Sequence, residues 1–210
     1  MRAIYLHGFA SGPGSRKAQV FKERLEDAGW SCDIPALDGG DFEHLTISGQ
    51  LAILDRMVAD EEVTLLGSSM GGYLAALYAA RHLNSVKQVV LLAPAFGFAH
   101  RWPERLGDEA LRNWEETGFL EIYHYAACRP ARVHFGLLAD GRKYEGFPRV
   151  LQPALVFHGR QDSVVPYEFS LEFQALHPAA RVHLYDAGHE LTEVIDQMWE
   201  ETARFLGLRQ

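Results

Sequence analysis

Cysteine is scarce in this sequence. Its 210 residues include only two, Cys32 and Cys128, and they form no motif. Two isolated thiols are typical of a reduced, cytosolic protein, so we expect a cytoplasmic location. The histidines, cysteines and aspartates also show no tight metal-ligand spacing, and the sequence therefore predicts neither a metal site nor another cofactor.

Positive charge is also in deficit. Lysine and arginine total 20 against 28 acidic residues, which gives a formal net charge of −8, and no run of basic residues interrupts this balance. Such a composition argues against a nucleic-acid surface. The longest uninterrupted apolar run, Val89–Gly97, is far too short for a membrane span, and the N-terminus has no signal-peptide pattern. We expect neither a nucleic-acid partner nor a membrane span.

Repeats, low-complexity tracts and interdomain linkers are missing as well. Hydrophobic residues make up 48% of the chain, which suits a single domain, residues 1–210, with a sizeable core. Apolar runs alternate with stretches of helical periodicity. The expected strands cover residues 3–7, 31–36, 63–66, 86–92, 154–158 and 181–185, and the expected helices cover 16–28, 45–59, 73–82, 109–116, 166–176 and 191–206. This alternation predicts an α/β fold with a mainly parallel sheet and helices on both faces.

The chain is organised around residues 67–72, a Gly-x-Ser-x-Gly pattern between an apolar run and an alanine-rich segment. At a strand-to-helix turn this pattern is the nucleophile elbow, which lifts a serine hydroxyl out of the sheet. The turn is so tight that the positions two residues before and after the nucleophile must be small. Around Ser69 these are Gly67 and Gly71, whereas around Ser68 they would be a leucine and a methionine. The pattern therefore predicts Ser69 as the nucleophile.

A serine hydroxyl needs a base beside it, and the base needs a group that fixes its tautomer. In hydrolases with this elbow the chain order is Ser, then Asp or Glu, then His. Asp162 follows the expected strand 154–158 and His189 follows the strand 181–185, so both leave the edge where sites of open α/β sheets lie. We predict Asp162 as the acid and His189 as the base. Asp186 is a rival acid, ranked second because it lies only three residues from His189.

Several of these residues also have purely structural interpretations. The glycine-rich turn could merely link a strand to a helix, Asp162 could cap the helix that follows it, and His189 could simply begin one. His7 and His158 also stand at strand ends, each before a glycine. We expect these two to bond the backbone of neighbouring loops. Three other histidines are expected to be solvated: His100, His124 and His177.

An oxyanion hole needs two backbone N–H groups aimed at the developing negative charge. One is expected from Met70, directly after the predicted nucleophile and at a helix N-terminus. The other is expected from the loop after the first strand, where we assign it to Phe9 with Ala10 as the alternative. The same loop is rich in glycine, but it lacks the Gly-Lys-Ser/Thr sequence of a phosphate-binding P-loop.

Together these blocks resemble the α/β-hydrolase superfamily in content and in order. The blocks that carry the resemblance are spread over most of the chain. They are residues 7–9, 67–72, 158–162, 165–166 and 188–189. The opening, residues 7–9 with 11–18, is similar to the small bacterial YqiA/YcfP-type esterases. The resemblance implies a serine hydrolase with Ser69 as nucleophile, Asp162 as acid and His189 as base. It also implies a compact sheet of about six or seven strands, because the chain begins at what is usually the third strand of this fold.

Residues 96–150 interrupt the alternation and hold 10 of the 24 aromatic residues, together with several arginines. The segment leaves the sheet after the strand that ends at Leu92 and returns before the strand that begins at Ala154. Since this connection emerges on the same edge as the elbow, we expect a short cap-like insertion over Ser69. Its aromatic residues either pack the insertion onto the sheet or line an apolar acyl pocket with a basic rim.

The leading interpretation is hydrolysis of a small carboxylic ester or thioester through an acyl-enzyme. Carbon–carbon bond hydrolysis and acyl transfer are alternatives, because they use the same triad and differ only in the pocket. A non-catalytic binding module on a hydrolase scaffold is a third alternative, and an intact triad argues against it. A haloalkane dehalogenase is excluded because it needs aspartate at position 69, where this sequence has serine.

Overall fold

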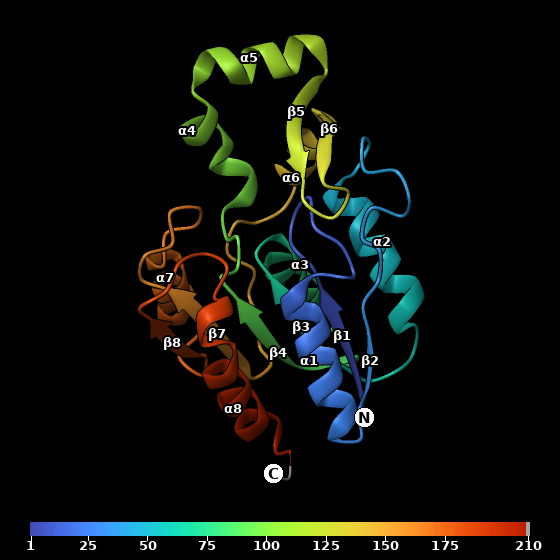
Figure 1. Ribbon diagram of the computed structural model, residues 1–210, viewed down its shortest axis with the longest axis vertical. Helices are drawn as coiled ribbons and strands as arrows, with labels where there is room; N and C mark the ends of the chain where they lie inside the picture. Colours follow the sequence, from blue (N-terminus) through green and yellow to red (C-terminus); the bar gives the residue numbers. More distant parts are fainter. Residues whose placement is uncertain (209–210) are drawn as a thin grey trace.

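Six parallel strands form the central sheet of the computed structural model, which describes residues 1–208 (Figure 1). They are β1 (Arg2–Leu6), β2 (Ser31–Asp33), β3 (Val63–Ser68), β4 (Val86–Leu92), β7 (Ala154–Gly159) and β8 (Arg181–Tyr185). Their order across the sheet is β2-β1-β3-β4-β7-β8, and each neighbouring pair is parallel. The predicted α/β fold with a mainly parallel sheet is confirmed.

Helices cover both faces of this sheet, as predicted. They are α1 (Arg16–Asp27), α2 (Ile47–Val58), α3 (Met70–Arg81), α7 (Glu168–Leu176) and α8 (Ile195–Leu206). Alternate strand residues point to opposite faces. Tyr5 and Val90 therefore pack with α1 and α8, whereas Ile4 and Val89 pack with α2, α3 and α7 on the other face. Within residues 1–208 no helix combines the length and the apolar character that a membrane crossing requires.

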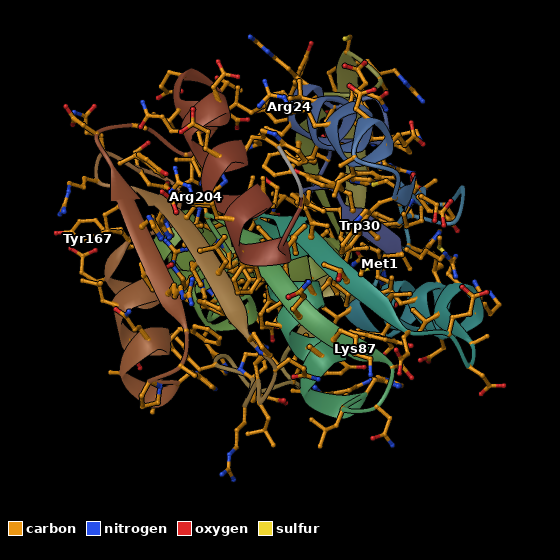
Figure 2. The ribbon with its side chains drawn as sticks, turned by 90° about the horizontal axis from the view of Figure 1, so that it is seen from below. Met1, Arg24, Trp30, Lys87, Tyr167 and Arg204 are labelled. Atoms are coloured by element: carbon orange, nitrogen blue, oxygen red, sulfur yellow. The ribbon has the colours of Figure 1, made fainter. Side chains whose placement is uncertain are left out.

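Helices α1 and α8 are tied to each other as well as to the sheet. Arg24 of α1, which is labelled in Figure 2, forms an ion pair with Asp196 of α8. Its guanidinium carbon lies 5.9 Å from the ring centroid of Trp199. The fully buried ring of Phe21 meets Trp199 edge-on, with 6.0 Å between the centroids. These contacts hold α1 in place, and the first turn of α1 lies at the edge of the sheet where the strands end.

Residues 96–150 form an insertion between β4 and β7, beyond the carboxyl ends of the strands (Figure 1). It contains the 3-10 helix η1 (Phe98–His100), the helices α4 (Trp102–Leu106), α5 (Asp108–Thr117) and α6 (Gly136–Gly141), and the antiparallel strands β5 (Phe119–His124) and β6 (Arg129–His134). The helix expected at residues 109–116 is present as α5. The β5–β6 hairpin is not predictable from the sequence, because Pro130 argues against a strand. Pro130 is tolerated here because β6 is an edge strand of a two-stranded ribbon.

The insertion is anchored at several points. The indole N–H of the buried Trp114 donates to the Val133 carbonyl at 3.0 Å and so joins α5 to the hairpin. The Tyr125 N–H, in the hairpin turn, donates to the Ala10 carbonyl at 2.8 Å. The hairpin therefore holds the loop that follows β1, which is the loop expected to supply an oxyanion-hole group.

Several elements differ from expectation at their ends, and the largest shifts are in α3, which begins at Met70 rather than at residue 73, in β2 and in the last helix. Strand β2 ends at Asp33 rather than at residue 36, because Pro35 has no N–H to give to the strand ladder. The last helix begins at Ile195 rather than at residue 191. Leu191 has a left-handed φ of 54° and is followed by the 3-10 turn η2 (Thr192–Val194), so the chain reaches α8 only after changing direction.

Candidate active site

Ser69 stands at the tip of the sharp turn between β3 and α3. Its φ of 55° and ψ of −118° are uncommon for a residue other than glycine. A Cβ placed on Gly67 would lie 2.3 Å from the Gly71 carbonyl oxygen, and a Cβ placed on Gly71 would lie 2.1 Å from the Leu6 carbonyl oxygen. The backbone therefore requires glycine two residues before and after Ser69. Ser68, in contrast, is the last residue of β3 and is buried.

Three side chains from distant parts of the chain meet at this turn. His189 Nε2 lies 3.0 Å from Ser69 Oγ, and His189 Nδ1 lies 2.7 Å from Asp162 Oδ2. His189 belongs to the loop after β8, and Asp162 belongs to the loop after β7. Because an ionised carboxylate can only accept, Nδ1 of His189 carries the hydrogen and Nε2 is free to accept the serine proton.

The Asp162 carboxylate is completely shielded from solvent, with a side-chain exposure of 0%. Its Oδ1 accepts hydrogen bonds from the N–H groups of Val164 and Val165, both at 2.8 Å. Burial alone raises the pKa of Asp162, but the hydrogen bonds from His158, His189 and the backbone outweigh it and hold this pKa well below its usual range. Asp162 is therefore an ionised partner for His189.

His158 is a second histidine on the same carboxylate oxygen. It is fully buried, and its Nε2 lies 3.1 Å from Asp162 Oδ2 and 2.9 Å from the Val165 carbonyl oxygen. Its Nδ1 lies 2.7 Å from the hydroxyl of Ser170, which is also fully buried. Since both contacts of Nε2 are acceptors, Nε2 carries the hydrogen. The expected backbone bond of His158 is present, to the Val165 carbonyl. The bond to Asp162 is not among the predicted contacts, and the four-residue spacing from His158 to Asp162 is the only signal for it.

Asp186, the rival acid, lies outside this chain of hydrogen bonds. Its carboxylate is exposed and accepts a hydrogen bond from the side-chain amide of Gln161. None of its hydrogen bonds within residues 1–208 involves His189. The structure thus brings Asp162, and not Asp186, against His189.

Two other histidines have structural contacts. His7 is buried, and its Nδ1 lies 3.0 Å from the Gly8 carbonyl oxygen, which agrees with the expected backbone bond. Burial lowers the pKa of His7. The expectation that His177 is solvated is wrong. His177 is buried, its Nδ1 donates to the Phe173 carbonyl at 2.7 Å, and its Nε2 accepts from the Val150 N–H at 3.1 Å. It thereby joins the end of the insertion to α7.

The residues expected to form the oxyanion hole lie beside Ser69. Phe9 and Met70 line the same cavity as Ser69, whereas Ala10 lines only a smaller neighbouring recess, which Met70 also lines. Met70 is the first residue of α3, so its N–H is one of those that a helix leaves without an internal partner. The helix dipole also favours negative charge at this point. The arrangement suits Phe9 better than Ala10 as the second donor.

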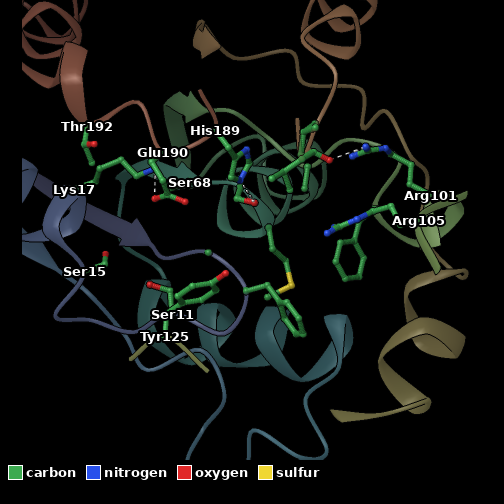
Figure 3. Close-up of a pocket in the computed structure, with 18 of the residues that line it drawn as sticks. Ser11, Ser15, Lys17, Ser68, Arg101, Arg105, Tyr125, His189, Glu190 and Thr192 are labelled. Carbon is green, nitrogen blue, oxygen red and sulfur yellow. Dashed lines mark hydrogen bonds and ion pairs between the residues drawn. The ribbon is translucent and has the colours of Figure 1, made fainter. Parts of the chain in front are cut away.

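Ser69 and His189 open into a cavity of about 640 Å³ (Figure 3). This volume lies within the range of about 300–1,000 Å³ that is typical of small-molecule sites. Phe98, Trp102 and Tyr125 line it from the insertion, which therefore forms one wall above Ser69. In residues 1–208, no three histidine, cysteine or acidic side chains gather as a metal ion would require.

The sheet order and the serine at the strand-to-helix elbow define an α/β-hydrolase fold. Alpha/beta hydrolase domain-containing protein 10 from mouse superposes with a TM-score of 0.82 over 98% of this chain and 89% of its own, at 20% identity. Residues 2–206 match the model of the uncharacterised protein family UPF0227, and the chain belongs to this family. The predicted resemblance to the superfamily and to YqiA/YcfP-type proteins is confirmed.

Two curated relatives are hydrolases by name. The AB hydrolase superfamily protein YisY of Bacillus subtilis (strain 168) is 27% identical over 166 residues, which span 61% of this chain and 60% of YisY. The 2-hydroxymuconate semialdehyde hydrolase of Pseudomonas sp. (strain CF600) is 26% identical over 217 residues, or 90% of this chain and 70% of that protein. The match to YisY thus spans less than two thirds of that protein. These relatives support a hydrolytic function.

Proposed function

We propose that this protein is a serine hydrolase that cleaves small carboxylic esters or thioesters. The observation that carries the proposal is the hydrogen-bonded chain from Ser69 through His189 to Asp162, with separations of 3.0 Å and 2.7 Å. Such a chain activates a serine that is otherwise a poor nucleophile. The hydrolase relatives and the cavity around Ser69 support the same reaction class.

The proposed reaction has two halves. Ser69 Oγ attacks the substrate carbonyl carbon while His189 Nε2 takes its proton, and the N–H groups of Phe9 and Met70 stabilise the oxyanion. The intermediate collapses, the carbon–oxygen or carbon–sulfur bond breaks, and His189 returns the proton to the leaving alcohol or thiol. Water then attacks the acyl-enzyme with His189 as base, which releases the acid and restores Ser69.

Asp162 and His158 have supporting roles in this proposal. The Asp162 carboxylate holds His189 with the hydrogen on Nδ1 and stabilises the imidazolium that forms. Asp162 itself is fixed by two backbone N–H groups and by His158. The direct test is hydrolysis of a panel of p-nitrophenyl esters and acyl-CoA thioesters by the purified protein. Cleavage of none of them would contradict the proposal and favour a carbon–carbon bond hydrolase.

Acyl-chain length is expected to matter. The aromatic wall of the cavity favours apolar acyl groups, and each buried methylene contributes about 0.8 kcal/mol until the pocket is full. Because the cavity is about 640 Å³, we expect kcat/KM for p-nitrophenyl esters to be highest for acyl groups of about two to eight carbons. A steady rise beyond about twelve carbons would contradict this and indicate a lipase-like substrate.

The rate is expected to depend on pH through one histidine. A general base must be neutral, and free histidine titrates near about pH 6.5. Because the pKa of Asp162 is held low, Asp162 stays ionised throughout the range in which histidines titrate. We therefore expect kcat/KM to fall toward acid pH, where the general base becomes protonated and can no longer accept the serine proton. A kcat/KM that stays flat from about pH 5 to 8 would argue against a histidine base.

A further inference from the structure

The cavity around Ser69 is basic, although the protein as a whole is acidic. The chain has a formal net charge of −8. Among the charged residues that line the cavity, in contrast, four are cationic and one, Glu190, is a carboxylate. The cationic residues are Arg16, Lys17, Arg101 and Arg105. A concave site lined by positive charge attracts negatively charged ligands, even on a protein whose net charge is negative.

The cations lie in two places, and the two groups differ in whether a carboxylate pairs with them. Lys17 lies on one side of His189 with Glu190, whereas Arg101 and Arg105 lie on the other side (Figure 3). Lys17 Nζ is 3.6 Å from the Glu190 carboxylate, and the Lys17 side chain is only 9% exposed. Arg16, the other lining cation of α1, is exposed and forms no ion pair within residues 1–208, whereas the charge of Lys17 is balanced by Glu190.

Arg101 and Arg105 have no such balance. Neither forms an ion pair with a carboxylate anywhere in residues 1–208. Burial and the neighbouring charge of Arg105 lower the pKa of Arg101 more than the negative charges of Glu104 and Asp162 raise it. Arg101, the N-cap residue of α4, and Arg105 of α4 are four residues apart, and their like charges repel each other. An anion placed beside them would relieve this repulsion.

Arg101 is also fixed in position. One of its terminal nitrogens donates to the Val164 carbonyl at 2.7 Å, and its guanidinium carbon lies 5.2 Å from the ring centroid of Phe169. Arg105 lies over Trp102, with 5.7 Å between its guanidinium carbon and the ring centroid. A carbonyl and two aromatic rings orient these groups without neutralising them. Arg101 is thus half-buried and preorganised for recognition, whereas Arg105 is exposed to solvent at the same cavity.

We propose that Arg101 and Arg105 form a subsite for an anionic group, a carboxylate or a phosphate, on the ester or thioester that Ser69 cleaves. This inference rests on the proposed serine hydrolase function. Guanidinium groups bind both kinds of anion through paired, charge-assisted hydrogen bonds. The substrate would then have a reactive carbonyl at Ser69, an apolar stretch against Phe98 and Trp102, and a negative charge beyond it.

Two pairs of substrates separate the possible positions of the anion. If the acyl part carries it, the protein will prefer mono-p-nitrophenyl glutarate to p-nitrophenyl pentanoate, which has an acyl chain of the same length without the carboxylate. If the leaving group carries it as phosphate, the protein will prefer butyryl-CoA to the butyryl thioester of N-acetylcysteamine, which lacks the phosphates. The ratio of kcat/KM within each pair measures anion recognition independently of the chemical step.

The variant that tests the subsite is Arg105→Gln, and Arg105→Lys retains the charge without the planar fork. Arg112→Gln is the matched control, because Arg112 is an exposed arginine of α5 outside the cavity. We expect at least one ratio to fall about tenfold in Arg105→Gln and less in Arg105→Lys, since a charge-assisted hydrogen bond is lost. The same ratio should stay at the wild-type value in Arg112→Gln and should decrease in high salt.

The outcomes separate the subsite from the hydrolase proposal. If the wild type cleaves the neutral esters but both ratios are the same in Arg105→Gln as in the wild type, the subsite is overturned and the hydrolase function stands. If the wild type cleaves none of the four substrates, the hydrolase proposal falls and the subsite falls with it.

Discussion

Replacing Ser69 by alanine is expected to abolish ester hydrolysis, with a loss in kcat of about 10⁶-fold, as for serine hydrolases that lose their nucleophile. The change removes only the Oγ that lies 3.0 Å from His189 Nε2. Alanine keeps the Cβ and can occupy the same strained turn, so the fold should survive. The measurement is kcat for the best p-nitrophenyl ester, with the thermal unfolding midpoint of each protein as a check on folding.

Ser68→Ala is the matched control for this experiment. Ser68 is adjacent to Ser69, but it belongs to β3, and its side chain does not hydrogen-bond to His189 in the described part of the chain. We expect Ser68→Ala to keep most of the activity. A protein that tolerates Ser69→Ala but not Ser68→Ala would overturn the assignment of the nucleophile.

Asp162→Asn is expected to lower kcat by about 10⁴-fold, the effect of the same change in the serine protease triad. The asparagine oxygen would stay with the N–H groups of Val164 and Val165, which bond Oδ1 in the wild type. Its NH₂ group would then meet His158 and His189, where the carboxylate had accepted their hydrogens. His189 would have to move its hydrogen to Nε2 and could no longer accept the serine proton.

The control for the acid is Asp186→Asn. Asp186 is exposed and bonds Gln161, so we expect its loss to change kcat far less than the loss of Asp162. Both variants should be compared by kcat on one ester and by circular dichroism. A larger effect at Asp186 than at Asp162 would show that the acid has been assigned to the wrong aspartate.

Much of the fold and the elbow could be predicted because local rules determine them. The periodicity of the strands and helices follows from which faces are buried, and Gly67 and Gly71 follow from crowding within the turn itself. Asp162 and His189 could be proposed together because the carboxyl ends of parallel strands meet at one edge of the sheet. Asp162 could be ranked above Asp186 as the acid because Asp186 lies only three residues from His189.

The remaining features depend on contacts that no local pattern encodes. The shape of the loop after β7 brings Asp162 to His158, and nothing in the three residues between them specifies that shape. His177 is buried because the chain returns from the insertion at Val150 and bonds it there. The β5–β6 hairpin also depends on a distant contact, since the His134 N–H in β6 donates to the Glu43 carbonyl of a loop far away in the sequence.

The most direct test of the account is to label the protein with a fluorophosphonate and to locate the adduct by mass spectrometry. A fluorophosphonate reacts only with a serine that a neighbouring base has activated. We expect a single adduct on Ser69 that is absent from Ser69→Ala and present in Ser68→Ala. An adduct on Ser68, or labelling that persists in Ser69→Ala, would contradict the proposal that Ser69 is the nucleophile.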